Sequence, residues 1–207
     1  NIYMSYDRPI LRDINFQIHN ITRPNMLQGQ VVSLIGRSGI GKTQLFKILS
    51  GLLDPISGTV RIGTDLHPVT AGEVGIVPQN YILFNHRSIL DNLKIGLRGS
   101  KNKLTEKEKT ELINNYAVKF GLQEHLKKYP MQLSGGQRQR VSIIQQILTG
   151  NKFILFDEPF SGLDPVIKDT VVELLVNISK LDELSTLIIV SHDIENSLAI
   201  SDTAFIL

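Results

Sequence analysis

The sequence contains a glycine-rich stretch, Gly36-Arg37-Ser38-Gly39-Ile40-Gly41-Lys42-Thr43, that fits the pattern G-x-x-x-x-G-K-[ST]. An apolar run, Val31 to Ile35, precedes it, and a helical pattern with Leu45, Ile48, Leu49 and Leu52 follows it. Glycines allow backbone N–H groups to converge on an anion, and a helix start adds partial positive charge. We therefore predict a phosphate-binding loop in which Lys42 reaches the β- and γ-phosphates and Thr43 ligates Mg²⁺. By itself, the loop indicates only that a nucleoside triphosphate binds.

Further short apolar runs alternate with helical patterns on both sides of this loop. These runs are Gly75 to Val77, Phe153 to Phe156 and Thr186 to Val190. Apolar strands alternating with helices predict an α/β fold with a mostly parallel sheet. The N-terminal part differs, because three segments there have the pattern of antiparallel strands: Ile2 to Tyr6, Leu11 to Ile18 and Thr59 to Ile62.

Capping residues mark three further helix starts. Thr105 with Glu108 and Ser134 with Gln137 are capping boxes, and Asp164-Pro165 is an N-cap followed by proline. The apolar residues expected to face inward in the first two helices are Leu112, Ile113, Tyr116, Ala117 and Phe120, and then Val141, Ile144 and Leu148. We expect residues 85–150 to form a mostly helical insertion in a single domain whose core comprises residues 1–84 and 151–207.

Composition limits the class of protein. The 207 residues suit one large domain or two small ones, and 22 Lys and Arg against 20 Asp and Glu give a net charge of +2. That charge is too small to indicate binding to nucleic acid or to an anionic membrane. The absence of cysteine excludes a disulfide framework and a thiol nucleophile. Because the chain begins with Asn1 and stops on the apolar run Thr203 to Leu207, we expect it to be a piece of a longer protein.

Two carboxylates follow the apolar run that ends at Phe156. A carboxylate at the tip of a buried strand beside a phosphate loop can hold Mg²⁺, which is the role predicted for Asp157. The adjacent Glu158 can act as the general base that polarises an attacking water. In isolation, the same two residues could simply end a strand at a solvent-facing turn.

The histidines differ in their placement. His192 follows the run Leu187 to Ser191, at the carboxyl end of a predicted strand, which is the edge where ligands bind in parallel sheets. A lone histidine is more often structural, but this position favours a contact with the γ-phosphate. The others have no such placement and are expected at the surface: His19, His67, His86 and His125.

The stretch Leu133-Ser134-Gly135-Gly136-Gln137, called here the signature motif, arises by chance in roughly one chain in several thousand of this length. With the phosphate loop and the strand carboxylates in this order, the sequence resembles the ABC ATPases over essentially its whole length. The resemblance implies a P-loop NTPase core with a mostly parallel sheet, an N-terminal antiparallel β subdomain and an inserted helical subdomain. It also implies hydrolysis of ATP with Mg²⁺.

The resemblance assigns further residues. Gln79 resembles the glutamine that reaches toward Mg²⁺ and the attacking water, and Asp164 belongs to the stretch Ser161-Gly162-Leu163-Asp164, which resembles the D-loop. Tyr6 is similar to the aromatic residue that stacks on adenine, with Tyr3 as a competitor. The residues expected to contact the nucleotide are Tyr6, Gly36, Arg37, Ser38, Gly39, Ile40, Gly41, Lys42, Thr43, Gln79, Ser134, Gly135, Gly136, Gln137 and Asp164. Those expected at the metal are Thr43, Gln79 and Asp157, and the catalytic set is Glu158, His192, Lys42 and Gln79.

The resemblance also implies partners. In this family, Ser134 and Gly136 contact ATP bound by a second copy or a paralogous domain, which predicts a head-to-tail dimer. The stretches Tyr129-Pro130-Met131-Gln132 and Ser191-His192-Asp193 are similar to importer-like members, which favours a transporter subunit at the cytoplasmic face of a membrane, bound to transmembrane permease subunits. Two alternatives stay open: a soluble ABC ATPase acting on ribosomes or DNA, and a nucleotide-binding module without turnover. The loop His19 to Gln28 is longer than the turn usual in the family.

Overall fold

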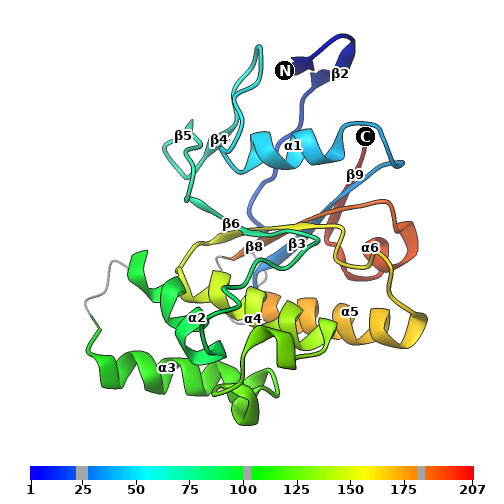
Figure 1. Ribbon diagram of the computed structural model, residues 1–207. Coiled ribbons are helices and arrows are strands. Elements are labelled where there is room, and N and C mark those ends of the chain that lie inside the picture. Colours follow the sequence, from blue (N-terminus) through cyan, green and yellow to red (C-terminus); the bar gives the residue numbers. More distant parts are fainter. Residues whose placement is uncertain (22–27, 100–103, 181–184) are drawn as a thin grey trace. The chain divides into compact units, whose positions relative to one another are not determined.

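A computed structural model describes residues 1–21, 28–99, 104–180 and 185–207. The chain forms two compact units, the first of residues 1–79 with 152–207 and the second of residues 80–151 (Figure 1). Residues 22–27 of the predicted surface loop His19 to Gln28 lie outside the described residues. Within the described ranges, no helix is long and apolar enough to cross a bilayer.

The first unit is built on a five-stranded sheet in which every pair of neighbours is parallel. Its strands are β3 (Gln30–Ile35), β6 (Val74–Val77), β7 (Phe153–Asp157), β8 (Thr186–Ser191) and β9 (Thr203–Ile206). They lie in the order β6-β7-β8-β3-β9, so that β8 separates β7 from β3. All residues of β3 and β8 are buried, as continuous apolar strands of a parallel sheet should be. The predicted α/β fold is confirmed.

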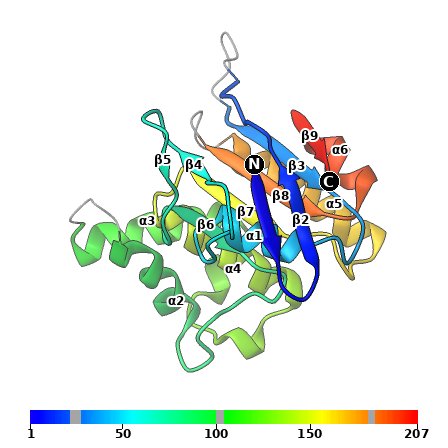
Figure 2. The same cartoon turned by 90° about the horizontal axis from the view of Figure 1, so that it is seen from above.

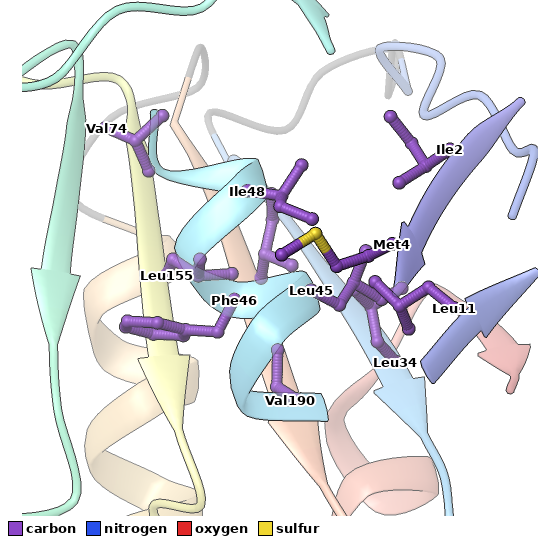
Figure 3. Close-up of a cluster of buried hydrophobic side chains, with 11 residues drawn as sticks. Ile2, Met4, Leu11, Leu34, Leu45, Phe46, Ile48, Val74, Leu155 and Val190 are labelled. Atoms are coloured by element: carbon purple, nitrogen blue, oxygen red, sulfur yellow. The ribbon is translucent and has the colours of Figure 1, made fainter. Parts of the chain in front are cut away.

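Helices cover both faces of this sheet. Helix α1 (Lys42–Leu49) packs on one face, and α5 (Pro165–Ser179) and α6 (Ile194–Ile200) pack on the other (Figure 1). Beneath α1 lies a cluster of buried side chains from α1, four strands of the sheet and the N-terminal hairpin: Ile2, Met4, Leu11, Leu34, Leu45, Phe46, Ile48, Val74, Leu155, Ile188 and Val190 (Figure 3). Each such side chain contributes about 1.5–3 kcal/mol when it is removed from water. The cluster therefore fixes the start of α1 against the sheet, and with it the glycine-rich loop.

Short antiparallel strands complete the first unit. Strands β1 (Ile2–Ser5) and β2 (Pro9–Ile14) form a hairpin (Figure 2), and β4 (Arg61–Ile62) pairs with β5 (His67–Pro68). The prediction that a strand runs from Leu11 to Ile18 was wrong in its bounds. Asp13 adopts a left-handed φ of +50°, and the strand ends one residue later.

Helix α1 is shorter than predicted. It ends at Leu49, and Gly51 has a φ of +71°, which turns the chain out of the helix. Leu52, expected on the apolar face of the helix, is therefore 54% exposed.

The second unit is helical. It contains α2 (Ile89–Gly96), α3 (Glu106–Lys119), α4 (Gly135–Leu148) and the single turns Leu97–Gly99, Gln123–His125 and Pro130–Gln132. Both predicted capping boxes are present, at Thr105 and at Ser134. Gly96 allows α2 to approach α4 closely, since a Cβ atom there would lie 2.4 Å from the carbonyl oxygen of Gln145.

Candidate functional site

The carboxyl ends of β3, β7 and β8 meet at one edge of the sheet. Two backbone hydrogen bonds continue the strand pairing beyond the strands: Gly36 N–H donates to the Ser191 carbonyl at 3.0 Å, and Glu158 N–H donates to the Val190 carbonyl at 2.8 Å. The glycine-rich loop, the strand carboxylates and His192 are therefore neighbours. Because these three segments come from distant parts of the sequence, it is the parallel order of the strands that assembles them.

The glycine-rich loop depends on backbone conformations that favour glycine. Gly39 and Gly41 have φ values of +85° and +100°, and α1 begins directly after Gly41. A Cβ atom at Gly41 would lie 2.6 Å from Cγ2 of Ile10 in β2, whereas one at Gly39 would meet nothing within 4 Å. Gly41 thus combines a left-handed turn with a tight contact against the hairpin.

Replacing Gly41 by alanine should destabilise the nucleotide-free protein by about 2–4 kcal/mol, because the left-handed conformation and the contact with Ile10 both oppose a Cβ atom. Gly39→Ala is the matched control, since it has the backbone penalty alone and should cost about 1–2 kcal/mol. Chemical denaturation of both variants measures the difference. Equal losses would show that the contact with Ile10 has no energetic weight.

Lys42, the first residue of α1, holds its ammonium group inside this edge. Its Nζ lies 2.9 Å from the carbonyl oxygens of Gly36 and of Arg37, and 3.2 Å from Oε1 of Glu158. The residue is only 7% exposed, so these three oxygens replace the water that a free ammonium would bind. The structure brings Lys42 and the proposed general base together, as their expected roles require.

Glu158 is the centre of the site. One carboxylate oxygen, Oε1, faces Lys42, and the other, Oε2, lies 2.7 Å from Nδ1 of His192, 3.2 Å from Oγ of Ser191 and 3.3 Å from the backbone nitrogen of His192. Its backbone has a φ of +50°, a conformation that non-glycine residues adopt at a cost and that concentrates at functional sites. Ser191 was not predicted as a site residue, although its place directly before His192 could have indicated it.

Asp157 and Thr43 are the candidate metal ligands of this edge. The pKa of Asp157 is raised by burial of its carboxyl group and by the neighbouring charge of Glu158, while Lys42 acts in the opposite direction. Thr43 is exposed in the first turn of α1. In the part of the chain that the structure describes, no group of three or more His, Cys, Asp or Glu side chains could hold a metal ion alone. A carboxylate and a hydroxyl suit Mg²⁺, which fills its remaining positions with phosphate and water oxygens.

Two of the other predicted nucleotide contacts lie in the first unit at exposed positions. Gln79 donates from Nε2 to Oγ of Ser161 at 3.2 Å, which ties the end of β6 to the segment after β7. Tyr6 is 60% exposed, and its hydroxyl donates to Oε1 of Gln44 in α1 at 3.4 Å. Its competitor Tyr3 is half-buried in β1, where its backbone pairs with Ser57.

Asp164, which was predicted to contact the nucleotide, forms the N-cap of a helix in the structure. Its Oδ1 accepts the Ile167 N–H at 3.1 Å and so caps α5. Upstream in the same segment, the Ser161 N–H donates to the Glu158 carbonyl at 3.1 Å. The segment between Glu158 and α5 is thus fixed at both ends.

The signature motif lies in the second unit, at the start of α4. Ser134 Oγ accepts the Gln137 N–H at 3.3 Å, and Oε1 of Gln137 accepts the Ser134 N–H at 2.9 Å. Between them, Gly135 and Gly136 have open surroundings, since a Cβ atom at either would meet nothing within 4 Å. The motif therefore forms a rigid helix start whose middle residues are accessible.

Two of the four remaining histidines differ from the prediction of simple surface positions. His19 and His86 are exposed, as expected. His67 is half-buried, with its Nδ1 2.8 Å from Oδ1 of Asp65 and its Nε2 2.7 Å from Oε1 of Glu73. These hydrogen bonds raise the pKa of His67. His125 is also half-buried, and its Nε2 lies 2.9 Å from Nε2 of Gln137 in the signature motif. The contact between His125 and Gln137 could not be predicted from the sequence, because it depends on how a loop folds back on α4.

Comparison with known proteins gives consistent matches. A family model described as "ABC transporter" matches residues 19–161. A spermidine/putrescine import ATP-binding protein (PotA) of Fusobacterium nucleatum is 36% identical over 98% of this chain and 52% of its own length. A thiamine import ATP-binding protein (ThiQ) of Aliivibrio fischeri is 34% identical over 88% of this chain and 78% of its own length. The chain thus spans about half of the first relative and most of the second.

The fold is also found among solved structures. The structure of cbiO1 from Clostridium perfringens, described as part of the ABC transporter complex cbiONQ, has a TM-score of 0.80 to this chain with 29% identity. The match covers 99% of this chain and 81% of the other. The fold is therefore shared over nearly all of this chain and most of the other.

Proposed function

This chain belongs to the ABC transporter family, and we propose that it binds and hydrolyses ATP to power the transport of a substrate across a membrane. One observation carries the hydrolytic part of the proposal. Glu158 is held between Lys42 at 3.2 Å and His192 at 2.7 Å, directly beside the glycine-rich loop. In this place, the Glu158 carboxylate would lie next to the terminal phosphate of a nucleotide bound by the loop.

Each residue of the site has a task in this reaction. Water attacks the γ-phosphorus in line with the leaving ADP oxygen, and Glu158 accepts the proton of that water. Lys42 and the loop amides stabilise the negative charge that develops on the phosphate oxygens. His192 positions the γ-phosphate, Gln79 responds to its presence, and Tyr6 stacks on the adenine.

The metal ion in this proposal is Mg²⁺, held by Thr43 and Asp157 with Gln79 reaching toward it. When bound, the ion neutralises phosphate charge. The residues present fit the ion, since they supply only hard oxygen and amide donors.

Phosphate release by the purified chain tests the proposed hydrolysis. We expect ATP-dependent release with Mg²⁺ and a loss of at least about tenfold when EDTA removes the metal, with recovery on adding Mg²⁺ back. Turnover that is unaffected by EDTA would contradict the metal assignment. No turnover under any of these conditions, with ATP nevertheless bound, would favour a nucleotide-binding module.

The dimer in this proposal is a head-to-tail pair. Ser134 and Gly136 of one copy contact ATP held by Lys42 of the other, and the helix start of α4 supplies the N–H groups and dipole that favour an anion. The relatives named above are import proteins and a component of a transporter complex. By similarity we propose transmembrane permease subunits as the partners that use the motion, with this chain at the cytoplasmic face.

The segment Tyr81 to Asn92 is the proposed contact with the permease. Ile82 and Phe84 are 72% and 45% exposed, and the Arg87 guanidinium lies 5.7 Å from the centre of the Phe84 ring. An exposed aromatic ring with a cation beside it is suited to a partner helix that has an apolar side and a polar end.

Phe84→Asp should reduce transport by at least about tenfold in the assembled transporter, because a charge would replace the apolar contact. ATP binding by the isolated chain should stay the same. The control is Val118→Asp, which places the same charge on an exposed apolar position of α3. Transport assays in proteoliposomes compare the two, and unchanged transport in Phe84→Asp would disprove the contact.

A further inference from the structure

The half-buried imidazole of His125 is joined to the signature motif by one side chain. Gln137 uses both ends of its amide: Oε1 accepts the Ser134 N–H at 2.9 Å, and Nε2 lies 2.9 Å from Nε2 of His125. The Ser134 N–H can only donate, so the amide oxygen of Gln137 must face it. The NH₂ group of Gln137 must therefore face His125.

This orientation determines where His125 carries its proton. An NH₂ group only donates, so Nε2 of His125 must accept, and the ring must be neutral with its hydrogen on Nδ1. Nδ1 is buried and has no hydrogen-bond partner among the described residues. An unpaired buried N–H is a cost that proteins rarely accept. The other tautomer would instead place an N–H against an NH₂ group and would break the link to Ser134.

The backbone holds His125 firmly in this place. Its N–H donates to the Leu122 carbonyl at 2.9 Å, and its own carbonyl accepts the Lys128 N–H at 2.9 Å. Leu122 and Leu126 on either side of this turn are 0% and 9% exposed. The imidazole is thus a fixed acceptor, and Gln137 is the flexible member of the pair.

We propose that His125 is a positioning residue for the signature motif: as a neutral acceptor, it holds the Gln137 amide in the orientation that closes the capping box on Ser134. The inference rests on the proposed function, in which Ser134 contacts ATP bound by a second copy. Without the acceptor, the Gln137 amide loses its fixed orientation, the Ser134 N–H loses its partner, and the start of α4 is no longer preorganised for a phosphate.

Conservative variants separate this role from general packing. Glutamine places an oxygen near the position of the imidazole Nε2, whereas asparagine places its polar atoms near Nδ1. Each His125 variant is combined with Glu158→Gln, which is expected to retain ATP. Size-exclusion chromatography with ATP then measures the protein concentration at which half of the chains are dimeric. We expect His125→Leu and His125→Asn to raise that concentration at least tenfold, and His125→Gln to keep it within about threefold of Glu158→Gln alone.

The outcomes distinguish the inference from the function on which it rests. If Glu158→Gln dimerises with ATP and all three His125 variants match it, the positioning role is wrong and the proposed dimer stands. An equal loss in the asparagine and glutamine variants would also overturn the role, because it would reflect packing rather than an acceptor at Nε2. If Glu158→Gln itself stays monomeric with ATP bound, the proposed dimer is wrong.

In that last case, nitrogen NMR of ¹⁵N-histidine-labelled protein still tests the hydrogen bond between His125 and Gln137, because it shows which ring nitrogen carries the proton. Among the five histidines, the ring signals of His125 are identified as those that His125→Gln lacks. We expect His125 to be neutral with its proton on Nδ1, and Gln137→Glu to move the proton to Nε2, because a carboxylate can only accept. A proton on Nε2 in the unmodified protein would overturn the inference.

Discussion

Glu158→Gln should slow phosphate release by at least ~10²-fold, since glutamine keeps the shape of the side chain but cannot take a proton from the attacking water. The amide can still hydrogen-bond Ser191 and His192, whose distances to Oε2 in the native protein are 3.2 and 2.7 Å. The ATP-bound state should therefore form and persist, and the protein should elute as a dimer only when ATP is present.

A matched control for this variant is Glu195→Gln, which makes the same change at an exposed position of α6. It should turn over ATP at the normal rate. Near-normal turnover in Glu158→Gln would contradict the role of general base. A protein that binds ATP but remains a monomer would leave that role intact and would contradict the head-to-tail pair.

Lys42→Ala should weaken ATP binding about ten- to hundredfold. Charge-assisted hydrogen bonds contribute roughly 1.5–3 kcal/mol each, and this lysine makes them with the ground-state phosphates as well as with the transition state. The substitution has a second effect, since it removes the cation that lies 3.2 Å from Oε1 of Glu158 and leaves that oxygen without its lysine partner, on a side chain that is 13% exposed. We therefore expect Lys42→Ala to lower the affinity for ATP and not only the rate of hydrolysis.

Calorimetric titration with ATP measures this effect. Lys47→Ala is the control, because it removes an equal charge from the exposed last turn of the same helix. It should leave affinity within about twofold, as expected for an exposed charge without a partner in the site. Equal affinities for the two variants would show that Lys42 does not contact the phosphates.

Much of the fold could be predicted from the sequence, because its strongest signals are local. Continuous apolar runs identified β3, β6, β7 and β8, and capping residues identified the starts of α3, α4 and α5. The predicted ends of one helix and one strand were wrong. Leu52 continues a helical pattern that Gly51 interrupts, and the strand expected from Leu11 to Ile18 ends at Ile14. In both cases, one residue with positive φ overrides a regular hydrophobic period.

The residues of the candidate site were also predictable, but their partners were not. The motifs indicated Lys42, Glu158 and His192, and the parallel sheet places them at one edge. Glu158 shares its two oxygens between the other two residues because of side-chain conformations in loops, and these have no repeating sequence pattern. His125 shows the same limit, since it lies twelve positions before Gln137 and the path of the intervening loop decides whether the two side chains meet.

The strand order has a consequence for synthesis of the chain on the ribosome. The sheet neighbours of β3 are β8 and β9, so that residues 30–35 have no strand to pair with until residue 186 has been made. At roughly 5–20 residues per second, this delay is on the order of 10–30 s. During that time, the apolar strand Gln30–Ile35 is an unpaired edge that a chaperone or another nascent chain can reach. Slower translation over residues 36–185 should therefore increase aggregation of this protein.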